Sequence, residues 1–138
     1  MPALKPKSFT YDVEVDGRGR IATDGTHVEI GDEWTADHLL LAAVVRCSIA
    51  SLTFHARRAD LDPTASGTAV GTVTMPEGEE RYRFVSIDVT LDVQLDPAPD
   101  EEALAELLAK AERDCFVGAS LQAKPRYAWT VNGAPVVV

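Results

Sequence analysis

The two cysteines of the chain, Cys47 and Cys115, are the residues whose type and setting point most directly to chemistry. Cys47 lies inside the apolar run 39–50, and Cys115 follows a second helical pattern. They are too far apart in the sequence for a Cys-x-x-Cys turn. A buried helical thiol with a distant second thiol is the arrangement of a two-cysteine thiol peroxidase. Two inert core cysteines would give the same pattern, because free cysteine is among the most buried residue types.

The composition predicts one globular domain, residues 1–138, of a soluble protein. Hydrophobic residues make up 46% of the chain and charged residues 25%, both ordinary values. The net charge is −9, with 22 acidic residues against 13 basic ones. A nucleic acid or an anionic membrane surface requires a basic face. The sequence therefore argues against both as partners.

The cellular setting and the absence of a metal are also expectations from the sequence. Residues 1–7 include basic residues but lead into no apolar stretch, so we expect no secretory signal. The longest apolar run, 39–45, is too short to span a bilayer. We expect a cytoplasmic protein, in which a structural disulfide is rare. The cysteines and the histidines His27, His38 and His55 show no metal-ligand spacing, so we predict neither a metal nor a cofactor.

The first half of the chain predicts strands followed by a long helix. Alternating apolar residues predict a half-buried strand over 9–15 and a turn over 16–20. Two short strands, 21–23 and 27–30, flank an Asp24-Gly25 turn. Thr35 is a suitable N-cap for a helix over 36–58, whose first half is apolar on nearly every side and is expected to be buried all round.

The second half predicts a strand pair, a second helix and a last strand. Strands over 69–75 and 81–95 are joined by a hairpin at 76–79, and the second strand alternates from Val85 to Leu95. An amphipathic helix opens at Pro99 with acidic residues in its first turn. A strand over 127–131 and an Asn132-Gly133 turn follow. This order of elements is an α+β pattern.

A cysteine reduces a peroxide only as the thiolate, so Cys47 would need a positive neighbour to offset its burial. Arginine suits this role because it stays charged when buried. Arg46 is about 100° around the helix from Cys47 and is expected to point away. Arg18 or Arg20, in the glycine-flanked loop, could fold over the helix.

Two residues at the start of the helix are further candidates. Asp37 lies about 80° from the line of Cys47 and could hold a loop arginine near the thiol, although it also suits the helix dipole. His38 falls about 180° away, on the opposite face, so we expect it to bond locally and not to act as a base for Cys47.

The segment from Thr35 to Cys47, TADHLLLAAVVRC, resembles the cysteine helix of the OsmC/Ohr family of organic hydroperoxide reductases. The alternating strand up to Leu95, the acidic helix and the segment 115–121 (CFVGASL) follow in the order and spacing of that family. The resemblance covers essentially the whole chain. Its specificity lies in the two cysteine contexts occurring together.

The resemblance implies an α+β fold in which a six-stranded antiparallel sheet wraps two central helices, in an intertwined homodimer. It implies that Cys47 attacks an organic hydroperoxide and becomes a sulfenic acid, which Cys115 resolves as a disulfide. A dithiol reductant, such as a lipoyl group, would then reduce the disulfide. Arg18 best matches the family's loop arginine, and Asp37 stands where the family has a glutamate.

The sequence departs from the family pattern around both cysteines. The glutamate is shortened to Asp37, and its neighbour is His38. The loop before the helix is 31–34 (GDEW) instead of a Gly/Asn/Pro-rich loop. Phe116 replaces the usual proline after the second cysteine, and Arg46 replaces a small residue before the first.

Two functions agree with these features. The first is a cytoplasmic hydroperoxide reductase that uses Cys47 and Cys115. The second is a non-peroxidase relative that binds a small molecule or senses redox state. The apolar side chains of Leu40 and Val44, on the same stripe as Cys47, favour an organic hydroperoxide, because an alkyl tail gains free energy by burial of its surface.

Overall fold

The computed structural model describes residues 6–138, which form two compact units. One unit ends at Ala36, and the other spans Asp37–Val138. The expectation about a secretory signal concerns residues 1–7, of which residues 1–5 lie outside the described part of the chain. Each unit is considered by itself below.

The first unit contains a three-stranded antiparallel sheet, built from β1 (Glu14–Val15), β2 (Arg20–Thr23) and β3 (Thr26–Glu29). The carboxylate of Asp16 shapes the first turn, because it accepts hydrogen bonds from the backbone N–H groups of Arg18 (2.8 Å) and Arg20 (3.1 Å). The second turn has positive φ at both Asp24 (46°) and Gly25 (76°), as a tight hairpin requires. Both predicted turns are confirmed.

The predicted half-buried strand over 9–15 is wrong in length and in burial. Only Glu14 and Val15 pair with a neighbour, and they do so with Ala22 and Ile21 of β2. The apolar side chains of this segment are exposed, including that of Tyr11, which is 85% accessible. The alternation marks extended backbone, but β2 is too short to pair with the whole segment.

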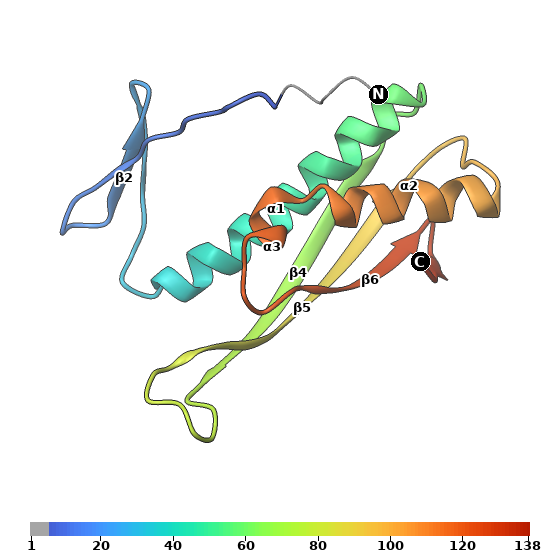
Figure 1. The fold of residues 1–138 in the computed structure, drawn as a ribbon. Helices are drawn as coiled ribbons and strands as arrows, with labels where there is room; N and C mark the ends of the chain where they lie inside the picture. Colours follow the sequence, from blue (N-terminus) through green and yellow to red (C-terminus); the bar gives the residue numbers. More distant parts are fainter. Residues whose placement is uncertain (1–5) are drawn as a thin grey trace. The chain divides into compact units, whose positions relative to one another are not determined.

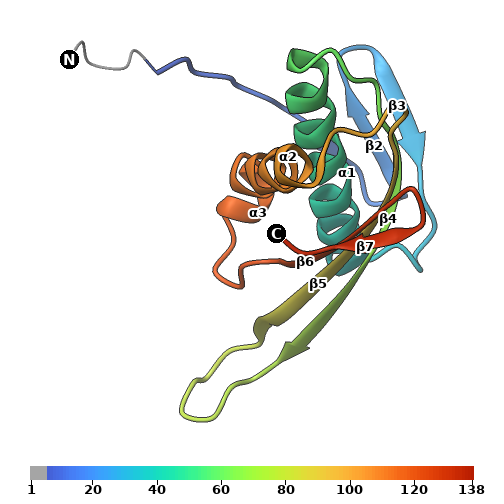
Figure 2. The same cartoon turned by 90° about the vertical axis from the view of Figure 1, so that its right-hand side faces the viewer.

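The second unit places two long helices on one face of a four-stranded sheet (Figures 1 and 2). The helices are α1 (Ala36–Arg58), which has the predicted bounds, α2 (Glu101–Arg113) and the short α3 (Phe116–Ala119). The strand order is β4-β5-β6-β7, with bounds Thr64–Thr74, Arg83–Gln94, Arg126–Val131 and Ala134–Val136. Strand β4 therefore begins earlier than the expected residue 69. Strands β5 and β6 are parallel, because α2 and α3 form the crossover between them.

The core lies between the helices and the sheet. The alternation in β5 is confirmed from Ile87 onward: Ile87, Val89, Leu91 and Val93 are buried, while the residues between them face outward and are exposed. It fails at Val85, which is exposed where an irregularity shifts the register between β4 and β5. Helix α2 adds its predicted apolar stripe, of which Leu107, Leu108 and Ala111 are buried. Asp100 caps this helix by accepting a hydrogen bond from the N–H of Ala103 (2.8 Å).

Helix α1 is not buried all round within the chain, contrary to the prediction. Its buried residues form one stripe: Val44, Ser48, Ser51, Leu52 and Ala56. Other apolar residues are exposed, including Phe54 at 57%. By length and composition alone α1 could cross a membrane, but it packs on the sheet as a core helix.

Small residues in β4 let α1 lie close to the sheet. A Cβ atom on Gly67 would be 2.7 Å from Leu91 Cδ2 and 3.1 Å from Val45 Cγ1. A Cβ atom on Gly71 would be 2.9 Å from Leu41 Cδ2. Any side chain at these positions would push the helix away. The two glycines thus help to set the distance between the sheet and the middle of α1, where Cys47 lies.

Candidate active site

The fold brings the two cysteines into contact. Cys47 lies in the middle of α1, and Cys115 is the N-cap of α3, directly after α2. Each thiol affects the pKa of the other, so the two side chains lie close together. Cys115 Sγ lies 3.6 Å from the hydroxyl oxygen of Ser48, the residue that follows Cys47. The contact between α1 and the end of α2 is fixed nearby by Ser51, whose hydroxyl donates to the carbonyl of Ala111 (2.8 Å).

Cys115 is fully buried among hydrogen-bond donors. Burial raises the pKa of its thiol, but the backbone N–H of Gly118 and the side chains of Ser48, Cys47 and Tyr127 lower it. The donors outweigh the burial, so the pKa of Cys115 lies below its ordinary value. A buried thiol without these partners would remain protonated.

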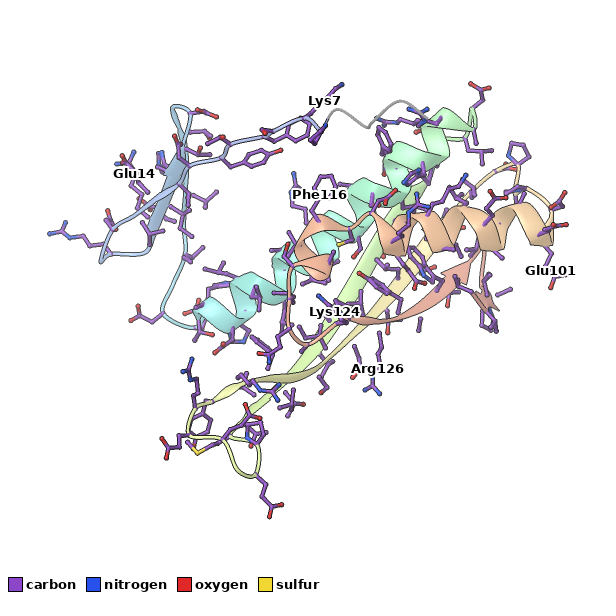
Figure 3. All side chains as sticks on the ribbon, viewed as in Figure 1. Lys7, Glu14, Glu101, Phe116, Lys124 and Arg126 are labelled. Carbon is purple, nitrogen blue, oxygen red and sulfur yellow. The ribbon has the colours of Figure 1, made fainter. Side chains whose placement is uncertain are left out.

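Cys47 is partly exposed, and its pKa is shifted in the opposite direction. Burial is the main reason that its pKa is raised, and the neighbouring Cys115 raises it further. The backbone N–H groups of Val117 and Phe116 lower it, without cancelling the increase. Phe116, at the start of α3, is labelled in Figure 3. Within this unit, the negative charge of the thiol pair is therefore favoured on Cys115.

Two hydroxyl groups complete the surroundings of Cys115. Ser48 Oγ lies 3.6 Å from Cys115 Sγ and 3.5 Å from Tyr127 Oη. Burial raises the pKa of Tyr127 to about 12, so this phenol stays protonated and can donate a hydrogen bond. Sequence reasoning missed both residues. Ser48 had one available signal, as a polar residue next to Cys47 in a strongly apolar helix, whereas Tyr127 had only its place in a predicted strand.

A charged cluster holds the junction between α2 and α3. His55 Nε2 lies 2.7 Å from Asp114 Oδ2, which joins α1 to the residue before Cys115. Arg113 donates two hydrogen bonds to the same carboxylate, both at 2.9 Å. These hydrogen bonds lower the pKa of Asp114 to about 2, and those from Arg113 contribute the larger share. The carboxylate is thus ionised throughout the neutral range.

The other predicted site residues lie on exposed parts of the two units. Arg18 and Arg20 belong to the first unit, and both are exposed. Asp37 lies in the first turn of α1 and is exposed. Arg46 is exposed too, as expected for a residue about 100° around the helix from Cys47. Residues 6–138 contain no group of three or more His, Cys, Asp or Glu side chains placed to hold a metal ion.

Comparison with known proteins identifies the family. The family described as OsmC-like protein matches residues 29–130, so the chain belongs to the OsmC-like family. No curated protein matches the sequence.

Solved structures share the fold at low sequence identity. An OsmC-like protein of Mycoplasma pneumoniae is 11% identical, with a TM-score of 0.69 over 91% of this chain and 98% of that one. The organic hydroperoxide resistance protein OhrB of Bacillus subtilis is 20% identical, with a TM-score of 0.55 over 90% and 98%. The organic hydroperoxide resistance protein OsmC of Legionella pneumophila is 15% identical, with a TM-score of 0.58 over 91% and 98%. These similarities confirm the predicted α+β, OsmC/Ohr-like fold.

Proposed function

We propose that the protein is a thiol-dependent peroxidase that reduces organic hydroperoxides with Cys47 and Cys115. The observation that carries the proposal is the proximity of these two thiols, which come from distant parts of the sequence and each affect the pKa of the other. Two inert core cysteines have no need to meet. Two structural relatives are named as organic hydroperoxide resistance proteins, which supports the proposed reaction with hydroperoxides.

The difference in exposure assigns the roles. Cys47 is partly exposed and Cys115 is fully buried, so a peroxide reaches Cys47 first. The Cys47 thiolate attacks the outer peroxide oxygen: an S–O bond forms, the O–O bond breaks, and the alkoxide leaves and takes up a proton. The sulfur loses two electrons and becomes a sulfenic acid, while the peroxide becomes an alcohol. Cys115 then forms the disulfide, and an external dithiol, such as a lipoyl group, reduces it.

The first step requires negative charge on Cys47, which its own unit disfavours. We propose that Arg18 provides the missing cation and that Asp37 positions it. A guanidinium group beside the sulfur would lower the pKa of Cys47 and could reverse the order of the two thiols. Arg20, in the same loop, is the alternative source of this charge.

The surroundings of Cys47 favour an apolar substrate. A cavity of about 150 Å³ is lined by Leu40, Phe84, Ile87, Leu121 and Ala123, together with Arg83 and Gln122. Leu40 lies seven positions before Cys47, which places it on the same face of α1, about two turns away. We propose this cavity, on the same face of α1 as Cys47, as the site for the alkyl chain of the substrate.

We also propose that the protein is a homodimer. Apolar side chains of α1 remain accessible within the chain, and Phe54 is 57% exposed. Strand β4 is a long edge strand, with the sheet on one side only. A helix of this composition and an unpaired edge are both expected to be covered in solution.

Variants of the two thiols test the reaction. Cys47→Ser should abolish turnover of cumene hydroperoxide with a dithiol reductant. Cys115→Ser should still consume about one peroxide per chain and leave a sulfenic acid that a dimedone probe traps. Full activity of Cys47→Ser would contradict the assignment.

A second experiment tests the activation of Cys47. In Cys115→Ser protein, Arg18→Ala should raise the pKa of Cys47, measured from the rate of alkylation against pH, and Arg20→Ala tests the alternative source of the charge. If the pKa of Cys47 is at or above its ordinary value and responds to neither change, the thiolate is not activated. The raised pKa of Cys47 in its own unit would then favour the second function, a protein that binds a small molecule or senses redox state.

A further inference from the structure

The hydroxyl group of Tyr127 lies near the sulfur of Cys115, and the reaction proposed for the two cysteines gives it no role. The side chain of Tyr127, from β6, lies close enough to Cys115 for each group to affect the pKa of the other. A Cβ atom placed on Gly118 would be 3.0 Å from Tyr127 Oη and 3.5 Å from Cys115 Sγ. The phenol and the thiol therefore flank the same point of α3, and the absence of a side chain at Gly118 keeps the space between them open.

Of the two hydroxyl groups near Cys115, that of Tyr127 has its hydrogen available for a hydrogen bond to the sulfur. Ser48 bridges the same two groups, at 3.6 Å from Cys115 Sγ and 3.5 Å from Tyr127 Oη. A serine hydroxyl has one hydrogen, and Ser48 donates at only 2.7 Å to the carbonyl of Val44. That short bond competes with the sulfur for the serine hydrogen, so Ser48 stabilises the Cys115 thiolate only in part. The phenol hydrogen of Tyr127 remains available for the sulfur of Cys115.

The position of Tyr127 also connects Cys115 with solvent. Cys115 is fully buried, so its proton cannot leave directly to water. Tyr127 and Gly118 line a cavity of about 360 Å³ on the other side, together with Glu112, Arg113 and Lys124. The charged and titratable groups that line this cavity are Glu112 and Arg113 from α2, Lys124 from the following loop and Tyr127 itself. Cys47, from α1, is the further titratable group close to Cys115. The carboxylate of Glu112 is held in place by a hydrogen bond from Trp129 Nε1 (2.8 Å).

We propose that Tyr127 is a further catalytic residue, which donates a hydrogen bond to the Cys115 sulfur and keeps it anionic for the resolving step. This inference rests on the proposed peroxidase function. In the step, the Cys115 thiolate attacks the sulfur of the Cys47 sulfenic acid. The S–S bond forms, the S–O bond breaks, and the hydroxide takes up a proton and leaves as water. The Cys115 sulfur is oxidised, and the Cys47 sulfur is reduced to the level of the disulfide.

The variant Tyr127→Phe removes the hydroxyl and keeps the ring, which stacks on Trp129 at 6.1 Å between centroids. One equivalent of cumene hydroperoxide is mixed with reduced protein, and peroxide consumption and free thiols are followed in time. Consumption should not slow, because a weaker hold on the charge at Cys115 favours the Cys47 thiolate, while loss of the second thiol should slow by about three- to tenfold. The larger factor is typical for the loss of one hydrogen bond to an anion, and the smaller allows for the greater nucleophilicity of a more basic thiolate. Tyr82→Phe, at a tyrosine that is 71% exposed, is the matched control.

A second measurement does not depend on peroxidase activity. In Cys47→Ser protein, the thiolate absorbance of Cys115 is titrated with and without Tyr127→Phe. The added change should raise the pKa of Cys115 by about one unit. An unchanged pKa and an unchanged second phase would overturn the role of Tyr127. If the wild type consumes no peroxide, the proposed function fails instead, and the titration alone decides whether Tyr127 stabilises the Cys115 thiolate.

Discussion

Replacing Phe116 by proline should reveal what the chain gains from its departure at this position. The family pattern has a proline after the second cysteine, and a proline has no backbone N–H. In this chain, the N–H of Phe116 lowers the pKa of Cys47. Phe116→Pro therefore removes a donor from the Cys47 sulfur without changing either cysteine.

The backbone at this position suits a proline, so the variant should fold. Cys115 has φ −77° and ψ 99°, an extended conformation of the kind preferred before proline. Phe116 is the first residue of α3, a position where proline is favoured. Its carbonyl accepts hydrogen bonds from the N–H and the hydroxyl of Ser120, and a proline would retain both.

The expected size of the effect follows from one lost hydrogen bond. A hydrogen bond to a charged group contributes roughly 1.5–3 kcal/mol, and the partial exposure of Cys47 places it near the lower end, at about 1.4 kcal/mol. That is about one pKa unit, or roughly a tenfold smaller thiolate fraction at neutral pH. A more basic thiolate is about threefold more nucleophilic per pKa unit. The net rate should thus fall by about threefold below the pKa, and the loss should disappear above it.

The assay follows alkylation of Cys47 by iodoacetamide against pH in Cys115→Ser protein, so that one thiol titrates. Phe116→Ala is the matched control, since it keeps the N–H but removes the ring, which is 69% exposed. We expect Phe116→Pro to titrate higher than Phe116→Ala, and Phe116→Ala to match the parent. Identical titration curves for the two variants would refute the reasoning, because the N–H is the difference between them that concerns Cys47.

Three further outcomes are expected. Gly67→Ala should lower the free energy of unfolding, measured in urea, by about 1–3 kcal/mol, because its methyl group would overlap the core between β4 and α1; an unchanged midpoint would mean that α1 can move away freely. Asp114→Asn should lower the free energy of unfolding by about 1 kcal/mol at pH 7, after allowance for the 37% exposure of the Asp114 side chain. Since the pKa of Asp114 is lowered to about 2, this contribution is present above pH 4 and should decline as the pH falls toward 2, and a cost that is independent of pH would contradict it. Light scattering at micromolar concentration should report a dimer, and a monomer would count against the proposed assembly.

The elements that the sequence predicted well are those in which one signal dominates. The period-two alternation of β5 fixes which of its side chains are buried, and the structure agrees from Ile87 to Val93. The apolar run and the N-cap residue Thr35 predicted the correct bounds of α1. The segment 9–15 shows the limit of the same signal. Alternation predicts an extended backbone, but a strand also needs a partner of equal length, which local sequence does not encode.

The site was less predictable, because its chemistry depends on contacts between distant segments. The sequence predicted the two cysteines as a pair, and the fold places them close together, yet nothing local indicated that Cys115 would be the more acidic one. That property comes from Ser48 on α1, Tyr127 on β6 and Gly118 on α3, which meet only after α1, α2 and the sheet have packed. Arg18 and Asp37 were inferred from resemblance, and their relation to Cys47 stays a prediction.

The acidity of the two thiols constrains how the reaction can proceed. Two thiolates in contact repel each other, so the reduced pair carries at most one negative charge near neutral pH. The contacts of Cys115 hold that charge on the buried sulfur, which disfavours attack by Cys47 but suits the later attack of Cys115 on the sulfenic acid. A peroxidase built this way needs a cation that acts on Cys47 in the first step only. Oxidation consumes the Cys47 thiolate, and the charge is then required on Cys115, where the hydroxyl of Tyr127 stabilises it.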